Sequence, residues 1–234
     1  MDDQEPEFDA ELIAHLKALN RIISQTHGTP GEVFRCIGNL FYDHATDYPV
    51  DAEPYAGYRD KRAFYAAAVK GRRSVLEVGF NAGHSALLAL WAQPGLTYTG
   101  VDICHTAYTI PCAEYLAQVF KHRFTMFKGD SREILPRLAT HHRERKFDTF
   151  HIDGDHAESP VRTDISNLLR LAPESALVIL DDIDFPGVAK AYNEFIELGR
   201  LRPATLRGFE ESRRQAVAIA VSDKQFLQPN GNNT

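Results

Sequence analysis

Acidic side chains recur through the middle of the chain, each at or just after the end of a short apolar run. Asp102, Asp130, Asp153 and the pair Asp181-Asp182 occupy such positions. Carboxylates can accept hydrogen bonds from ribose hydroxyls, take up a proton, or hold a divalent cation. Loop capping alone requires fewer acids than this, so the pattern predicts one binding site assembled at an edge of a sheet.

A glycine-containing turn precedes these acids. The apolar run Ser74–Val78 leads to Gly79 and Gly83, and a helical apolar pattern begins immediately afterwards. Glycine tolerates positive φ and lets a ligand approach the backbone, while a helix N-terminus offers unpaired N–H groups. The third glycine of a G-x-G-x-x-G fingerprint is missing. We therefore expect a nucleoside carrying a compact, non-phosphate group rather than a pyrophosphate.

Asp102 ends the next predicted strand, about twenty residues after the turn. In dinucleotide-binding folds an acid at this place accepts hydrogen bonds from the ribose hydroxyls. The alternative is that Asp102 only caps its loop. The preceding glycine turn favours the ribose interpretation.

Asp153, Asp181 and Asp182 end two strands that should be neighbours in the sheet. Three carboxylates can then converge, and such all-oxygen ligands suit Mg²⁺, Ca²⁺ or Mn²⁺ better than zinc. The alternative is that the paired acids cap the next loop while His156 caps a helix that begins at Ser159.

The periodicity of apolar residues predicts the elements that position these acids. A helix at about 8–23, an irregular aromatic segment at 32–58 and a helix at 60–69 form an N-terminal cap. Strands and helices then alternate, and two closing strands at 203–209 and 216–221 form an antiparallel hairpin. We predict an α/β fold with a doubly wound, mostly parallel seven-stranded sheet. The predicted divisions are a cap at 1–70, a cofactor-binding domain at 71–224 and a disordered tail at 225–234.

Composition sets wider limits on function. The net charge of −6 argues against a nucleic-acid partner, and no apolar run is long enough to span a membrane. The three cysteines show no metal-like spacing, and the acidic residues after Met1 differ from a signal peptide. We expect a cytoplasmic protein with a small-molecule acceptor, and the amphipathic N-terminal helix is compatible with a homodimer.

The chain resembles the class I S-adenosylmethionine-dependent methyltransferases over about residues 72–221, and most of all their small O-methyltransferase branch. An Ile-Asp-Gly-Asp-His motif followed by a Leu-Asp-Asp strand end is typical of that branch. The motifs that carry the resemblance, in family order, are Glu77-x-Gly79-x-x-x-Gly83, Asp102, Gly129-Asp130-Ser131, Phe147–Asp153 and Asp181-Asp182.

The resemblance implies a cofactor site for S-adenosylmethionine. The turn after Gly79 would contact the methionine part and Glu77 would hold nearby backbone or the ammonium group. Asp102 would bind the ribose, and Asp130 with Ser131 would flank the adenine. The full set expected at the cofactor is Glu77, Gly79, Phe80, Asn81, Gly83, Ser85, Asp102, Ile103, Gly129, Asp130, Ser131 and Asp153.

The resemblance also implies a metal-assisted transfer. In metal-dependent relatives the residues at Asp153, Asp181 and Asp182 bind a divalent ion, here Mg²⁺ or another divalent cation. The catechol-type enzymes have a lysine base three residues after the first metal carboxylate, where this chain has His156, with Asp155 beside it. The base is therefore either His156 or Asp155, and it would accept the proton of the acceptor hydroxyl.

Two other classes of function remain open at this point. One is an NAD(P)-dependent oxidoreductase on a related fold, which the missing third glycine disfavours. The other is a non-catalytic nucleoside-binding module, which the intact acids at the strand ends disfavour.

Overall fold

A computed structural model describes residues 8–26, 34–141, 147–209 and 214–221 of the chain. Its strands form one seven-stranded sheet in the order β3-β2-β1-β4-β5-β7-β6. The strands are β1 (Ser74–Val78), β2 (Thr97–Asp102), β3 (Phe124–Lys128), β4 (Thr149–Ile152), β5 (Leu177–Leu180), β6 (Leu201–Ala204) and β7 (Ala216–Ala220). The α-helices are α1 (Ala10–Thr26), α2 (Arg59–Val69), α3 (His84–Ala92), α4 (Thr109–Phe120), α5 (Ser131–His141), α6 (Glu158–Leu171) and α7 (Pro186–Glu197).

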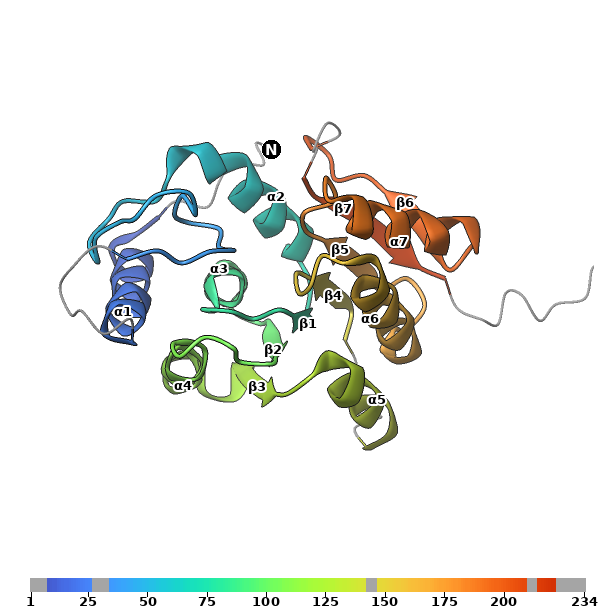
Figure 1. Cartoon of the computed structure of the whole chain (residues 1–234), viewed down its shortest axis with the longest axis horizontal. Helices are drawn as coiled ribbons and strands as arrows, with labels where there is room; N and C mark the ends of the chain where they lie inside the picture. The colour runs from blue at the N-terminus through green and yellow to red at the C-terminus, as the bar shows by residue number, and fades with distance from the viewer. Residues whose placement is uncertain (1–7, 27–33, 142–146, 210–213, 222–234) are drawn as a thin grey trace, which may run out of the picture.

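Helices cover both faces of the sheet, as Figure 1 shows. Apolar residues of α1, α2, α3 and α4 form one buried cluster on one face, and those of α5, α6 and α7 form a second cluster on the other. The central strands are apolar along nearly their whole length because both of their faces are covered. This is the predicted doubly wound architecture.

The strand order reverses between β1 and β4. The two strands are parallel neighbours, and β1 pairs in parallel with β2 on its other side. Register pairs Val78 with Val101 on one side and with Ile152 on the other, so the ends of these strands lie level. Parallel strands therefore bring the loops that follow β1, β2, β3, β4 and β5 to one edge. That edge is where ligands bind in open α/β sheets.

The last two strands form the predicted antiparallel arrangement, with β7 inserted between β5 and β6. The first of them covers Leu201–Ala204, earlier in the chain than the predicted 203–209. Gly199, with φ of 67°, ends the turn after α7, so the chain re-enters the sheet almost at once. The predicted tail at 225–234 lies outside the described residues.

The start of α6 also differs from the prediction. The helix begins at Glu158 with Ala157 as its N-cap, two residues before the expected start after Ser159. The Asp155 carboxylate accepts the Ala157 N–H, and Pro160 sits within the first turn, where no N–H is needed. His156 is thereby left free of helix capping.

The N-terminal region packs on the rest of the chain. Leu12, Leu16, Leu19 and Ile23 of α1 are fully buried against α3 and α4, so the cap shares its core with the sheet. The irregular segment before α2 contains one isolated bridge, between Phe34 and Tyr48. The apolar stripe of α1 is used within the chain, and a homodimer would need another surface.

Candidate functional site

A cavity of about 500 Å³ opens at the edge of the sheet where the parallel strands end. Residues from five loops line it, together with Gly38 of the cap. Among the residues proposed from sequence, those that line it are Gly79, Asn81, Asp102, Ile103, Gly129, Asp130, Ser131, Asp153, Asp155, His156 and Asp182.

The turn after β1 is shaped by its first glycine. Gly79 has φ of 95°, and a Cβ there would overlap the carbonyl oxygen of Asp153 after β4. Only glycine allows the two loops to approach this closely. Two residues further on in the turn, the side-chain amide of Asn81 donates to the carbonyls of Ile37 and Gly38 at 2.6 and 2.8 Å. The turn is thus joined to the cap.

Asp102 lies where a ribose acceptor should lie. Its Oδ2 accepts the Asn81 N–H at 2.8 Å and its Oδ1 accepts the Cys104 N–H at 2.6 Å. Each carboxylate oxygen has further acceptor capacity, and the side chain lines the cavity. The ribose assignment stays a prediction, now with a geometry that fits it.

Four residues proposed for the cofactor do not line the cavity. Glu77 is fully buried, where its Oε1 accepts hydrogen bonds from Ser85 and lies 2.9 Å from Nδ1 of His151. Phe80 is also buried, and its ring fills the space that a Cβ at Gly83 would need. These residues shape the turn from below, and a ligand in the cavity would meet the turn's backbone.

Burial and charge act in opposite directions on His151. Burial lowers its pKa, but the hydrogen bond and the charge of Glu77 outweigh burial and raise the pKa above the ordinary value. The raised pKa favours the protonated imidazole, which lies against Glu77 between the first and fourth strands, beneath the turn. Such a pair holds the register of two strands whose ends carry the site.

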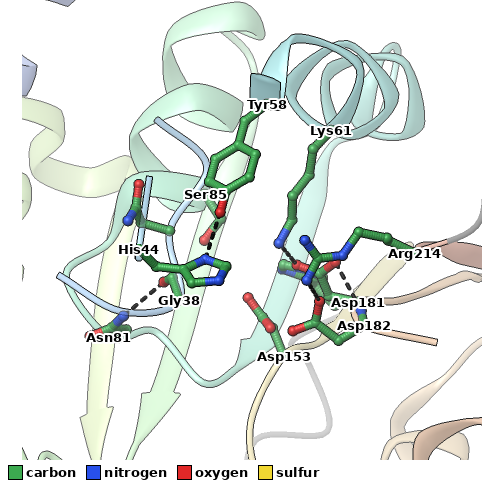
Figure 2. Close-up of polar contacts among 12 residues, drawn as sticks. Gly38, His44, Tyr58, Lys61, Asn81, Ser85, Asp153, Asp181, Asp182 and Arg214 are labelled. Carbon is green, nitrogen blue, oxygen red and sulfur yellow. Dashed lines mark hydrogen bonds and ion pairs between the residues drawn. The ribbon is translucent and has the colours of Figure 1, made fainter. Parts of the chain in front are cut away.

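Acids and cations meet at the other end of the cavity (Figure 2). Lys61 of α2 places Nζ 2.6 Å from Asp181 Oδ2, and Arg214 places Nη2 2.7 Å from Asp182 Oδ1. His156 Nε2 lies 3.5 Å from Asp182 Oδ2 and 4.0 Å from Asp153 Oδ1. Asp181 and Asp182 are each paired with a cation, and Asp182 rather than Asp181 groups with Asp153 and His156.

These neighbours shift the pKa of each titrating group. Burial and the adjacent charge of Asp181 raise the pKa of Asp153. The nearby carboxylate of Asp153 raises the pKa of His156, and the charge of Asp182 adds to the rise although burial opposes it. Two titrating groups with raised pKa values therefore lie 4.0 Å apart at the cavity.

The proposed base Asp155 has a different environment. Its Oδ1 accepts the N–H of Ala157 at 2.8 Å, and the residue is exposed. Asp155 borders the cavity but does not take part in the acid group. His156 is therefore the better placed of the two candidates.

The cap contributes polar residues that sequence reasoning missed. Tyr58 OH lies 2.6 Å from Nδ1 of His44, and Figure 2 shows both side chains pointing toward the space above Asp153. Lys61 lies on α2, three residues after Tyr58. Their segment is irregular in sequence, so only long-range packing brings it over the acids. In the sequence, the one indication of this arrangement was that Lys61 falls on the side of the helix that is expected to be buried.

Comparison with known proteins agrees with this geometry. Residues 76–183 match a family model described as a methyltransferase domain. No curated protein sequence matches the chain significantly.

Solved structures with similar folds are methyltransferases. The O-methyltransferase TomG of Streptomyces achromogenes, involved in tomaymycin synthesis and solved with S-adenosylmethionine, matches with TM-score 0.58 and 16% identity over 92% of this chain and 91% of its own. A Podospora anserina methyltransferase bound to S-adenosylhomocysteine matches with TM-score 0.55 and 14% identity over 72% and 83%. The TDP-rhamnose 3'-O-methyltransferase CalS11 of calicheamicin biosynthesis matches with TM-score 0.52 and 17% identity over 67% and 75%. Residues 76–183 are therefore similar to a methyltransferase domain, and the chain has the fold of these S-adenosylmethionine-dependent methyltransferases.

Proposed function

We propose that this protein transfers the methyl group of S-adenosylmethionine to a hydroxyl of a small molecule. The observation that carries the proposal is the continuity of one cavity. It runs from the turn at Gly79 and the ribose-type acid Asp102 to the titrating pair Asp153 and His156. The methyltransferase-domain match supports this function over the oxidoreductase alternative.

The reaction would be an in-line displacement at the sulfonium methyl. The acceptor oxygen forms the new C–O bond as the C–S bond breaks, which leaves S-adenosylhomocysteine and one proton. The turn and Asp102 would orient the cofactor, and positioning is the protein's main contribution. We propose that His156 takes the proton, with Asp153 stabilising the imidazolium that forms.

We propose that the acceptor enters between the cap and the acids. His44 and Tyr58 lie on the cap side, and Asp153 lies on the sheet side (Figure 2). Phe185, which is 44% exposed, packs its ring 4.7 Å from the ring of His156. An acceptor in this space would meet one apolar wall and several groups able to bind a hydroxyl.

A direct transfer assay tests the function. Purified protein is incubated with methyl-labelled S-adenosylmethionine and a panel of phenols, sugars and hydroxy acids, and product and S-adenosylhomocysteine are quantified by mass spectrometry. We expect one class of hydroxyl to be methylated, and His156→Ala to lose at least about 100-fold in kcat. Failure of S-adenosylhomocysteine to bind in calorimetry would reject the proposal.

The divalent ion is a narrower part of the proposal. Carboxylate oxygens of Asp153 and Asp182 lie within 4.8 Å of each other and would hold one ion, with His156 beside them kept as the base. Asp181 fits poorly, because its Oδ1 accepts the Asp182 N–H and its Oδ2 contacts Lys61. When bound, the ion would supply a Lewis acid that lowers the pKa of the acceptor hydroxyl.

Metal binding is testable without the acceptor. We expect Mn²⁺ titration to show one site, weakened at least about 10-fold in Asp153→Asn. Lys61→Met should tighten it, because a competing positive charge is removed. EDTA should suppress methyl transfer and leave S-adenosylhomocysteine binding intact. Full transfer in EDTA, with no Mn²⁺ site, would remove the metal from the mechanism.

The cellular location also belongs to the proposal. No helix in the described part of the chain is both long and apolar enough to cross a membrane. Cys36, Cys104 and Cys112 are all unpaired thiols. We propose a cytoplasmic location on the basis of the reduced cysteines.

A further inference from the structure

A buried acid of α6 borders the cavity between the loop after β3 and the loop after β4. Asp164 is only 3% exposed and lines the cavity together with Ser131 and Gly154. The hydroxyl of Ser131 donates to its Oδ1 at 2.6 Å. Its Oδ2 lies over Gly154, where a Cβ would come to 4.0 Å from it, and has no hydrogen-bond donor among the described residues.

Three other acids of the pocket already have donors on their carboxylates. Asp102 accepts two backbone N–H groups. Asp130 is gripped by the guanidinium of Arg132, whose Nε lies 2.9 Å from Oδ1, and Asp182 pairs with Arg214. Asp164 has neither an ion-pair partner nor a second donor among the residues described. Burial accordingly raises its pKa to about 6.

A buried carboxylate with one unused oxygen favours a ligand that brings a hydrogen-bond donor. Asp164 is bonded to Ser131, in the loop where the sequence resemblance places the adenine, so a base bound beside Gly129 and Ser131 would lie within reach of its free oxygen. Adenine presents its exocyclic amine as a donor, whereas hypoxanthine presents an oxygen at the same place.

We propose that Asp164 binds the exocyclic amine of the cofactor's adenine and selects adenine over 6-oxopurines. This inference rests on the proposed function. It moves the recognition of adenine from Asp130, which the sequence motif suggested, to Asp164 of α6, thirty-four positions later. Arg132 holds Asp130 in a fork, and Ser131 serves to orient Asp164.

The test compares two ligands that differ only at this position of the base. Calorimetry measures the affinities of S-adenosylhomocysteine and of S-inosylhomocysteine, in which an oxygen replaces the amine. Wild-type protein should prefer the adenine form by about 10- to 100-fold, the effect of one charge-assisted hydrogen bond. Asp164→Asn should lose this preference, because its amide can also donate to the oxygen of hypoxanthine.

Two further variants sharpen the comparison. Glu133→Gln removes an exposed acid of α5 that does not line the cavity, and should keep the wild-type preference. Asp130→Asn tests the competing assignment. Loss of the preference in Asp130→Asn but not in Asp164→Asn would overturn the proposal. Equal affinities of the wild-type protein for S-adenosylhomocysteine and S-inosylhomocysteine would also overturn it. If wild-type protein binds neither ligand, the proposed function itself fails.

Discussion

Asp102 shows how one side chain can both build a site and bind in it. Its two oxygens hold the N–H groups of Asn81 and Cys104, so it joins the turn after β1 to the loop after β2. Both of those residues have positive φ, 53° and 61°, a conformation that costs energy in non-glycine residues. The carboxylate helps to offset that cost while leaving lone pairs for a ribose.

We therefore expect Asp102→Ala to weaken S-adenosylhomocysteine binding at least about 100-fold in calorimetry, since two charge-assisted hydrogen bonds are lost. Asp102→Asn retains one acceptor oxygen, so its affinity for S-adenosylhomocysteine should lie between those of wild type and Asp102→Ala. Undiminished binding in Asp102→Ala would contradict the ribose assignment.

At the scale of elements, α3 is unusual because it is buried all around. Every residue from His84 to Leu90 is buried, between the cap and the sheet. His84 lies against the rings of Phe41 and Tyr42, and neither of its nitrogens has a hydrogen-bond partner in the described part of the chain. Burial lowers the pKa of His84 to about 4. The helix that begins at the cofactor turn thus carries an acid-sensitive group.

This pKa shift predicts how stability depends on pH. The unfolded chain, with a histidine pKa of about 6.5, binds a proton more readily than the folded chain. The contribution of His84 to stability is therefore complete above about pH 6.5 and is lost as pH falls toward 4. At pH 5 the loss is about 2 kcal/mol.

His84→Phe should abolish this loss, since phenylalanine does not titrate and fits an aromatic surrounding. Urea unfolding at pH 7.5 and pH 5 measures the difference. His141→Gln, at an exposed position on α5, is the control and should retain the wild-type pH dependence. Equal pH dependence in His84→Phe and wild type would contradict the assignment.

At the scale of the whole molecule, the cap and the sheet form one packed unit. Arg62 of α2 is buried and donates to the carbonyls of Leu40 and Tyr55, at 3.1 and 2.9 Å. Its guanidinium also lies 5.3 and 5.7 Å from the ring centroids of Phe8 and Phe41. One side chain thus ties the irregular segment, including His44 and Tyr58, to the helix that carries Lys61.

Arg62→Met should therefore loosen the cap while leaving the cofactor end of the cavity in place. We expect a loss of about 2–4 kcal/mol in the free energy of unfolding, because two buried carbonyls lose their donor. Limited proteolysis should show faster cleavage within residues 38–57, with S-adenosylhomocysteine affinity changed less than 3-fold. A loss of S-adenosylhomocysteine affinity well above 3-fold would mean that the cap also holds the turn after β1.

Sequence reasoning recovered the parts of the fold that depend on local pattern. Alternating apolar strands and helices predicted the doubly wound sheet, and most of the residues proposed from the glycine turn and the strand ends border one cavity. Apolar periodicity and turn chemistry are local signals, so one chain suffices to interpret them. The helix start at Glu158 was missed because the expected Ser159 cap is not used and no side chain caps the helix that begins after Ala157.

What the sequence by itself determined was the set of acids and the order in which the strand ends present them. Only the tertiary structure decided which acids are available to a ligand. It placed Glu77 beneath the turn with His151, bound Asp130 to Arg132, and brought Lys61 and Arg214 to Asp181 and Asp182. It left Asp164 buried with an unused oxygen. The physical reason is that most of these pairings, such as Glu77 with His151 and Lys61 with Asp181, join side chains tens of residues apart, whose distances are set by packing and leave no periodic trace in the sequence.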